Sequence, residues 1–280
     1  MEKHDAAKAS PNVLEFKGVS VQFGGVRAVN NVDLTLARGE FLGLIGPNGA
    51  GKTTLLNLIS GAMPPTSGEI LFNGQSIVGI SPDRLCHLGI SRTFQNIRLF
   101  PKMTVFENVA LGLHARPNYS LTDALFCTPR SIRREKQNIE RANGLLDLVG
   151  LSAYAKKHAG DLSYGLQRRL DLVRAMATDP QLLLLDEPAA GMNEDECGNL
   201  TKLIRSIHQE FGFGVILIEH HIQVVMELCR ESRIYVMNLG EILASGTPME
   251  IQNDTKVINA YLGEKRTTNG RTRRQISRNC

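Results

Sequence analysis

The sequence predicts an α/β fold built around a parallel β-sheet, and two observations lead to this class. The first is a set of short, almost wholly apolar runs, which are typical of strands buried on both faces of a sheet: FLGLI at 41–45, LLLLD at 182–186 and GVILIE at 214–219. The second is that stretches with helical character follow these runs. Strands that alternate with helices indicate parallel pairing.

The N-terminal part of the chain predicts several strands and one helix. Alternating or apolar runs punctuated by Gly and Asn predict strands at 13–23, 32–36, 41–45 and 69–72. A glycine-rich turn at 46–51 precedes a helix predicted at about 52–60. The last of these strands ends in the Asn73–Gly74 turn.

A helical insert interrupts this frame at about 100–160. In its charged segment 130–151, Ile132, Ile139 and Leu145–Leu146 would share one face of a largely solvated helix. The frame then resumes with strands predicted at 182–186, 214–219, 233–237 and 241–244, and helices near 194–210 and 221–229. We therefore predict one body over 12–264, a helical subdomain inserted at about 97–165, and disordered ends at 1–11 and 265–280.

The basic character of the chain comes from its C-terminal end. The whole sequence carries 32 Lys and Arg against 28 Asp and Glu, but residues 265–280 hold six cations and no acid. Without those six, 26 cations remain against 28 acids, so the body has a net charge of −2. A nucleic-acid-binding function argued from overall charge is therefore weak. The tail reads as a solvated extension, with contact to anionic lipid as the alternative.

Other features exclude further classes of protein. No run of about 18 apolar residues exists, and residues 1–11 lack the apolar stretch of a signal peptide. The five cysteines are scattered, odd in number and contain no C-x-x-C pair. They predict reduced thiols rather than a disulfide framework or a zinc site.

A phosphate-binding loop is predicted at 46–54, GPNGAGKTT, which satisfies the pattern G-x-x-x-x-G-K-[ST]. Glycines let successive backbone N–H groups turn toward a phosphate, and the following helix adds its positive end. The lysine would reach the β- and γ-phosphates and the following threonine hydroxyl would bind Mg²⁺. The alternative is an ordinary glycine-rich turn before a helix. The predicted nucleotide-binding residues are Gly46, Pro47, Asn48, Gly49, Ala50, Gly51, Lys52, Thr53 and Thr54.

A second half of the site is predicted where LLLLDEP at 182–188 ends in two carboxylates. A buried strand that delivers Asp186 at its carboxyl end suits Mg²⁺ beside a nucleotide. The adjacent Glu187 would act as the general base that polarises an attacking water. Taken alone, such a strand end is common, so the phosphate loop upstream is what favours this interpretation.

The segment LSYGLQRRL at 162–170 narrows the class. This segment and its surroundings resemble the ATP-binding-cassette (ABC) superfamily, whose signature is LSGGQ, over about residues 12–264. The resemblance implies a P-loop ABC domain with a RecA-like parallel-sheet core, an antiparallel β subdomain and an α-helical subdomain. It further implies the Q-loop glutamine at Gln95, the switch histidine at His220, an adenine-stacking aromatic at Phe23, and signature residues Ser163 and Gly165.

Each of these matches has a simpler interpretation on its own. Phe23 could be a core or turn aromatic, Gln95 a strand cap, Ser163 a helix N-cap and His220 a surface histidine. Their joint order favours the site. The chain departs from the family where Tyr164 replaces Gly, Leu166 replaces Gln, and Asn193 occupies the usual aspartate position of the D-loop.

The resemblance implies an ATPase that works as a dimer, with ATP held between the phosphate loop of one subunit and the signature of the other. Its cofactors would be ATP and Mg²⁺. The metal would be held by Thr53, Gln95 and Asp186, and catalysis would rest on Glu187, His220 and Gln95. The implied partners are integral membrane permease subunits, a second ATP-binding subunit and, indirectly, a periplasmic binding protein, with no nucleic acid. The chain would be peripheral on the cytoplasmic face of the inner membrane.

The transported substrate is suggested only by resemblance. Residues 91–109 and the VINAYLGE run at 257–264 look most like the ATP-binding subunit of branched-chain amino-acid importers. Relatives for urea or amide uptake or for lipopolysaccharide extraction are alternatives, as is a non-transport ABC ATPase acting on nucleic acid or ribosomes. A G-protein-like switch lacks its N-K-x-D motif here. The permease would dock near residues 95–105 and within about 105–160.

Overall fold

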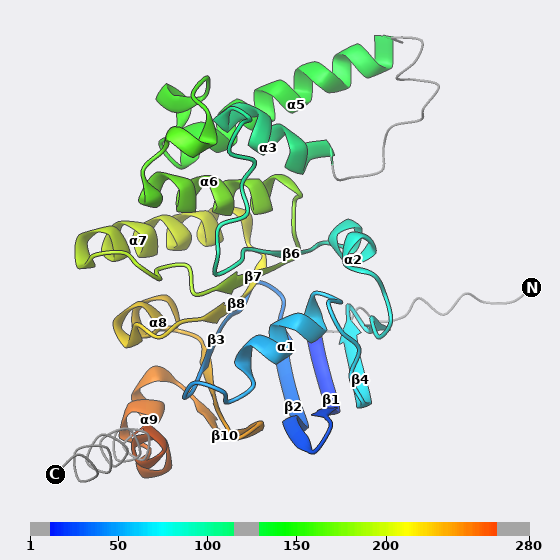
Figure 1. Cartoon of the computed structure of the whole chain (residues 1–280), viewed down its shortest axis with the longest axis vertical. Helices are drawn as coiled ribbons and strands as arrows, with labels where there is room; N and C mark the ends of the chain where they lie inside the picture. Colours follow the sequence, from blue (N-terminus) through cyan, green and yellow to red (C-terminus); the bar gives the residue numbers. More distant parts are fainter. Residues whose placement is uncertain (1–11, 115–128, 262–280) are drawn as a thin grey trace, which may run out of the picture. The chain divides into compact units, whose positions relative to one another are not determined.

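The computed structural model describes residues 12–114 and 129–261 (Figure 1). The chain falls into two compact units. The first unit contains the chain up to residue 79 and again from residue 216 onward, and the second contains residues 80–215. The predicted disordered ends, 1–11 and 265–280, lie outside the described residues.

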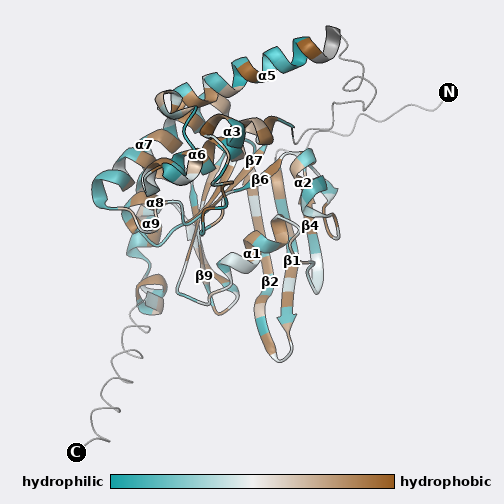
Figure 2. Ribbon diagram, turned by 45° about the horizontal axis from the view of Figure 1, so that its top comes forward, coloured by the Kyte–Doolittle hydropathy of each residue, from teal (hydrophilic) through white to brown (hydrophobic). Residues whose placement is uncertain are grey.

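The first unit contains an antiparallel sheet of four strands in the order β2-β1-β4-β5. Its strands are β1 (Asn12–Phe23), β2 (Val26–Ala37), β4 (Ser67–Phe72) and β5 (Gln75–Ser76). Leu14 lies opposite both Leu36 and Phe72, so this register places apolar residues together on the buried face. Figure 2 shows hydrophilic and hydrophobic residues mixed along β1 and β2, as expected of strands with one solvated face. The predicted turn at Asn73–Gly74 is confirmed, with positive φ at both residues.

The first unit also contributes parallel strands. Its strand order is β10-β9-β3-β8, where β3 pairs in parallel with β9. All five residues of β3 are buried, which confirms the strand predicted from FLGLI. The bounds are β3 (Phe41–Ile45), β8 (Gly214–Ile218, which starts in the second unit), β9 (Arg233–Asn238), β10 (Glu241–Gly246), α1 (Lys52–Ile59), α8 (Ile222–Leu228) and α9 (Pro248–Asn253).

Cys229, at the end of α8, shows how closely this unit is packed. A Cβ atom built on Gly43 would lie 3.0 Å from the Cys229 Sγ, which is a tight contact, so a larger residue at 43 would require the thiol to shift by a few tenths of an ångström. Burial raises the pKa of the Cys229 thiol to about 12, so it stays protonated. A buried, protonated thiol of this kind is unreactive, which is compatible with the predicted reduced cysteine.

The second unit places helices around two parallel strands, β6 (Ile90–Arg92) and β7 (Leu182–Asp186). All five residues of β7 are buried, as predicted. The sequence pattern did not predict β6, because three residues are too few to show a period. The helices are α2 (Pro82–Leu88), α3 (Val105–His114), α5 (Pro129–Leu148), α6 (Tyr164–Ala177) and α7 (Glu194–Phe211), with 3₁₀ turns at Ser152–Tyr154 and Ala159–Asp161.

Helices α3, α5 and α6 pack together in the second unit (Figure 1). Helix α3 approaches α6 at Gly112, where a Cβ atom would lie 2.6 Å from the carbonyl oxygen of Arg174. The helix predicted within 130–151 is confirmed, but its predicted apolar face is partly wrong. Leu145 and Leu146 are buried, whereas Ile132 and Ile139 are 60% and 45% exposed. Only the C-terminal part of α5 therefore faces the core.

Candidate functional site

The phosphate loop joins β3 to α1 in the first unit, and two of its glycines are required by space. A Cβ atom at Gly46 would lie 2.1 Å from the carbonyl oxygen of Met237, and one at Gly51 would lie 2.4 Å from that of Ala28. Both glycines also have positive φ, at 149° and 103°. Real Cβ atoms do not come this close to backbone oxygen, so the loop can take this shape only with glycine. An ordinary turn would not need glycine for such a reason.

Lys52 begins α1 and points back into the loop. Its side chain is 5% exposed, and its Nζ donates to the carbonyl oxygens of Gly46 and Pro47 at 2.6 and 2.8 Å. Among the described residues, no side chain caps the N-terminus of α1. The positive end of the helix and a buried ammonium group thus meet at one loop, which is an arrangement that binds anions.

We expect Gly46→Ala to destabilise the protein by about 2–5 kcal/mol, because it adds backbone strain to an overlap with the Met237 carbonyl. Gly49→Ala is the matched control. Gly49 also has positive φ, at 76°, but its added Cβ meets nothing within 4 Å, so only about 1–2 kcal/mol of strain is expected. Urea unfolding of both variants measures the difference. Equal losses would show that the Met237 contact is not what requires glycine at residue 46.

Two further predicted site residues lie in the first unit. Phe23 ends β1 and is 55% exposed, so it is not the core aromatic of the alternative interpretation. His220 follows β8 and is exposed. The sequence interpretation missed Glu219, a carboxylate only 3% exposed whose Oε2 accepts from the backbone N–H groups of His220 and His221 at 2.9 and 3.1 Å. This carboxylate fixes the backbone that presents His220, and an acid directly before a histidine pair was the available signal.

In the second unit, the carboxylate of Asp186 at the end of β7 is buried and ion-paired. Its Oδ2 lies 2.6 Å from Arg92 Nη2, and both side chains are less than a tenth exposed. Arg92 ends β6, the strand paired with β7, so the sheet itself brings the two groups together. The sequence interpretation did not include Arg92. Its only signal was a cation three residues before Gln95.

The structure brings Gln95 and Glu187 together, although they lie 92 residues apart. The Gln95 Nε2 donates to Glu187 Oε2 at 2.7 Å. Glu187 has φ of 48°, an uncommon conformation for a non-glycine residue that occurs often at functional sites. This contact joins the proposed general base to the proposed Q-loop residue.

The signature residues lie at the start of α6. Ser163 occupies the N-cap position, but its side chain makes no capping hydrogen bond, so the N-cap interpretation does not account for its hydroxyl. At Gly165 a Cβ atom would lie 3.4 Å from Glu196 Oε1. Leu166 replaces the usual glutamine, and the neighbouring Gln167 uses its amide in a local contact, in which Nε2 donates to the Leu162 carbonyl at 3.0 Å.

Asn193 has a structural use in addition to its predicted place in the D-loop. It caps α7, with its side chain accepting from the Glu196 N–H at 2.9 Å while Glu196 accepts from the Asn193 N–H at 3.1 Å. This reciprocal pair is a capping box, which stabilises a helix start. The loss of charge relative to aspartate is therefore compatible with an intact helix terminus.

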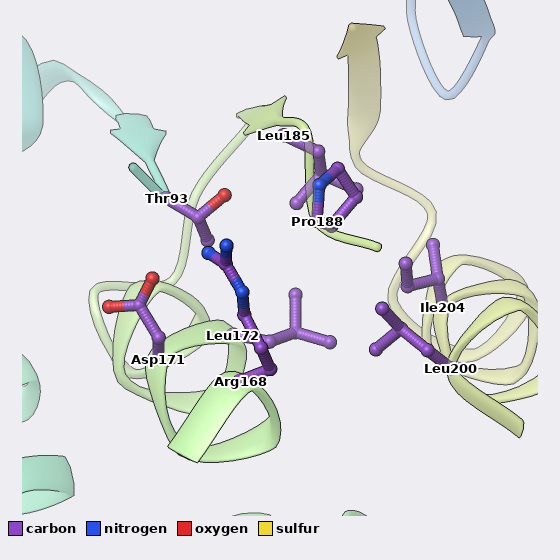
Figure 3. Close-up of a pocket in the computed structure, with 8 residues that line it drawn as sticks. All are labelled: Thr93, Arg168, Asp171, Leu172, Leu185, Pro188, Leu200 and Ile204. Carbon is purple, nitrogen blue, oxygen red and sulfur yellow. The ribbon is translucent and has the colours of Figure 1, made fainter. Parts of the chain in front are cut away.

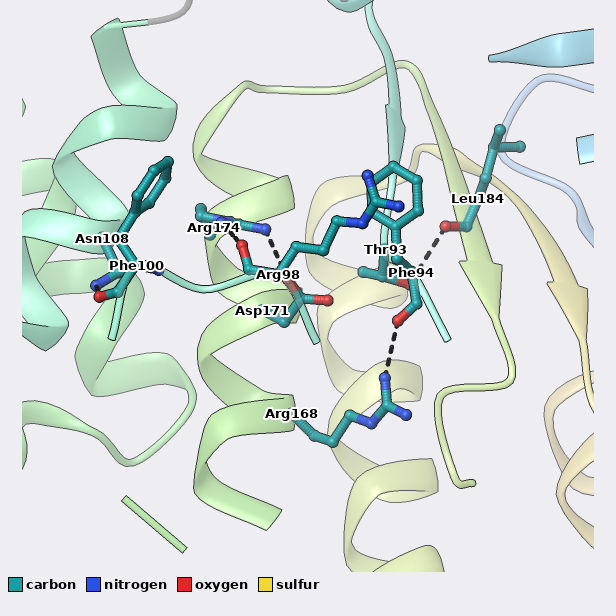
Figure 4. A network of polar contacts seen from close by, with 9 residues as sticks. All are labelled: Thr93, Phe94, Arg98, Phe100, Asn108, Arg168, Asp171, Arg174 and Leu184. Atoms are coloured by element: carbon teal, nitrogen blue, oxygen red, sulfur yellow. Dashed lines mark hydrogen bonds and ion pairs between the residues drawn. The ribbon is translucent and has the colours of Figure 1, made fainter. Parts of the chain in front are cut away.

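The segment that follows Gln95 is held by two side chains (Figure 4). Asn108, fully buried on α3, donates to the Phe100 carbonyl at 3.1 Å and accepts from its N–H at 2.9 Å. Arg174 on α6 donates to the Arg98 carbonyl. Phe100 is 51% exposed. This segment therefore presents an aromatic side chain from a firmly anchored backbone.

A small cavity lies between helices α6 and α7 of the second unit. It measures about 10 Å³ and is lined by Thr93, Arg168, Asp171, Leu172, Leu185, Pro188, Leu200 and Ile204 (Figure 3). Burial raises the pKa of Asp171, and the guanidinium groups of Arg174 and Arg168 oppose that rise. The Asp171 Oδ1 is 2.8 Å from Arg174 Nη2. The cavity is far too small for a nucleotide, so it belongs to the packing of the site.

The predicted Mg²⁺ donors are a hydroxyl, an amide oxygen and a carboxylate, from Thr53, Gln95 and Asp186. Oxygen ligands of this kind are the ones that Mg²⁺ prefers, so the donor set fits the ion. Thr53 is exposed on α1 in the first unit, and Gln95 and Asp186 lie in the second. Over residues 12–114 and 129–261, no group of three or more His, Cys, Asp or Glu side chains could hold a metal ion.

Comparison with known proteins identifies the family. The family model described as ABC transporter matches residues 29–190, and a second model, described as branched-chain amino acid ATP-binding cassette transporter, matches residues 241–266. The chain belongs to the ABC transporter family. It is therefore an ABC transporter ATPase that binds ATP, as its resemblance implied. In the described part of this ABC ATPase, no helix is long and apolar enough to cross a membrane.

Individual relatives agree with this ABC assignment. The chain is 43% identical over 255 residues to the high-affinity branched-chain amino acid transport ATP-binding protein LivG of Escherichia coli K12, covering 91% of this chain and 99% of the relative. The ADP conformation of MJ1267, an ATP-binding cassette of an ABC transporter, matches with 30% identity and a TM-score of 0.77 over 90% of this chain and 99% of that one. The dimeric bacterial ABC transporter cassette MJ0796 matches with 26% identity and a TM-score of 0.70 over 84% and 98%. The predicted fold class is thus confirmed.

Proposed function

We propose that this chain is the ATP-hydrolysing subunit that powers a membrane ABC importer for branched-chain amino acids. One observation carries the choice of substrate: the 43% identity to LivG extends over nearly the whole of both chains. The separate match of residues 241–266 to a branched-chain amino-acid model supports the same choice.

The proposed mechanism assigns roles to residues of both units. Lys52 and the N-terminus of α1 would hold the phosphates, Phe23 would stack on the adenine, and Thr53, Gln95 and Asp186 would hold Mg²⁺. When bound, Mg²⁺ would neutralise charge on the phosphates. The same loop includes Pro47, Asn48, Ala50 and Thr54.

The chemical step needs an activated water and stabilised charge. Glu187 takes the proton of the attacking water, while Gln95 and His220 contact the γ-phosphate or that water. The 2.7 Å contact between Gln95 and Glu187 supports their acting together. Ser163 and Gly165 of a second ATP-binding subunit would close over the γ-phosphate. The open and closed dimers would differ in their affinities for ATP and ADP, and this difference would drive the opening and closing of the dimer.

The proposed partners are integral membrane permease subunits on the cytoplasmic face of the inner membrane, a second cassette subunit, and a periplasmic binding protein acting indirectly. The permease would dock on the segment after Gln95. The anchoring of that segment by Asn108 and the exposure of Phe100 support this surface.

The test is transport in the native host. Cells lacking this gene should lose uptake of radiolabelled leucine, and the wild-type gene should restore it, whereas a gene encoding Lys52→Met should not. Urea uptake serves as the control and should be unaffected. Loss of urea uptake instead of leucine uptake would contradict the proposal that the importer carries branched-chain amino acids. Purification of the chain without any integral membrane partner would count against transport.

A further inference from the structure

Tyr164, where the family signature usually has glycine, uses its hydroxyl to join two segments of the second unit. The Tyr164 Oη donates to the carbonyl oxygen of Ala190 at 2.9 Å and accepts from Arg168 Nη2 at 2.8 Å. Arg168 lies one helical turn further along α6, on the same face, with its guanidinium carbon 5.2 Å from the centre of the Tyr164 ring. A glycine at residue 164 could make neither hydrogen bond.

Arg168 carries the connection to the Q-loop. The Arg168 Nη1 donates to the Phe94 carbonyl at 2.9 Å, a contact drawn in Figure 4, and Nη2 donates to the Gln95 carbonyl at 2.5 Å. The planar fork of an arginine can hold two successive carbonyl groups in a fixed geometry, which a lysine cannot do. Arg168 is only 4% exposed, and Asp171 on the same helix offsets its charge. A buried cation that uses its hydrogen bonds in this way fixes the backbone it binds.

The contacts close into a ring around the proposed catalytic pair. The Gln95 side chain donates to Glu187, the Ala190 N–H donates to the Glu187 carbonyl at 3.1 Å, and the Ala190 carbonyl accepts from Tyr164. Tyr164 binds Arg168, and Arg168 binds the Gln95 carbonyl. Gln95 and Glu187 are therefore held through their backbones as well as through their side chains.

We infer that Arg168 and Tyr164 are positioning residues that set the placement of Gln95 relative to Glu187 from the signature helix. The inference rests on the proposed roles of Gln95 and Glu187. Neither positioning residue needs to touch ATP. The tyrosine that departs from the signature thereby acquires a use that its sequence position alone does not show.

The test combines three variants of the full-length chain. Arg168→Met removes the fork, Arg168→Lys keeps the charge without the fork, and Tyr164→Phe removes a single oxygen atom. We expect kcat for ATP hydrolysis to fall by about 10- to 100-fold in Arg168→Met and by about 3- to 10-fold in Tyr164→Phe, with Arg168→Lys in between. KM for ATP should change less than about two-fold, since neither side chain belongs to the phosphate loop.

A double-variant measurement distinguishes the positioning of Gln95 by Arg168 from a purely structural role of Arg168. If Arg168 acts through Gln95, then Arg168→Met should change kcat by less than about two-fold in a Gln95→Ala background. An equal fold-loss in both backgrounds would overturn the inference. Lys202→Met, at an exposed position of α7 in the same unit, is the control and should leave kcat unchanged.

Hydrogen exchange tests the positioning without any turnover. Backbone amides of residues 94–98 should exchange at least about 10-fold faster in Tyr164→Phe and Arg168→Met than in the wild type, while α7 stays unchanged. Unchanged exchange at 94–98 would overturn the inference, and Tyr164→Phe keeps the test valid if Arg168→Met does not fold. A wild-type chain without ATPase activity would instead contradict the proposed function, and the exchange result would still decide the positioning.

Discussion

Glu187→Gln should lower kcat for ATP hydrolysis by at least about 100-fold while leaving ATP binding intact, because it removes only the proposed general base. The substitution preserves the shape of the site. A glutamine at residue 187 still offers a carbonyl oxygen to Gln95 Nε2, which in the wild type lies 2.7 Å from Glu187 Oε2. Since the closed dimer would bind ATP without consuming it, an ATP-dependent dimer should accumulate. Steady-state hydrolysis and gel filtration with and without ATP measure both effects.

The matched control is Glu194→Gln, which removes an exposed carboxylate from the first turn of α7 in the same unit. This control should hydrolyse ATP at the wild-type rate. Hydrolysis by Glu187→Gln at the wild-type rate would show that another group activates the water. A dimer that forms equally without ATP would show that the variant traps no nucleotide-bound state.

Lys52→Met should weaken ATP binding by about 100-fold or more. The substitution keeps the apolar stem and removes the buried ammonium group, which is proposed to make charge-assisted hydrogen bonds to the phosphates. It also removes the donor to the Gly46 and Pro47 carbonyls, at 2.6 and 2.8 Å, so the nucleotide-free protein should lose about 1–3 kcal/mol of stability. Equilibrium binding of ATP and urea unfolding measure the two effects separately.

Lys202→Met, an exposed position on α7, is the control and should change neither quantity. Unaltered ATP affinity in Lys52→Met would mean that the helix N-terminus and loop amides hold the phosphates without the lysine. A loss of stability together with normal affinity would assign Lys52 to the loop alone.

The phosphate loop was predictable from sequence because its requirements are local. A strand, a turn that needs glycine and a helix start follow one another within fifteen residues, and each leaves its own mark on the residue types. The buried strands β3 and β7 were predictable for the same reason, since a continuous apolar run of four or five residues marks a strand covered on both faces.

Contacts between distant segments left no such mark. The pairing of Arg92 with Asp186 depends on β6 lying beside β7, and β6 is only three residues long. Tyr164 was visible as a departure from the signature, but its partner at Ala190 is a backbone carbonyl, which no residue type reveals. The exposure of Ile132 likewise depends on which part of α5 meets the core. Resemblance supplied roles for Gln95 and His220 that the residues alone left open.

The collisions that forbid a side chain at Gly46 and Gly51 involve the carbonyl oxygens of Met237 and Ala28. Every amino acid has a backbone carbonyl oxygen, so these two contacts do not depend on which residues supply the oxygens. A substitution at residue 28 changes the side chain and leaves the carbonyl oxygen in place, whereas no other residue can replace the two glycines. The evolutionary constraint from this contact therefore falls on one side only, and related chains should vary more freely at residue 28 than at the glycine it faces.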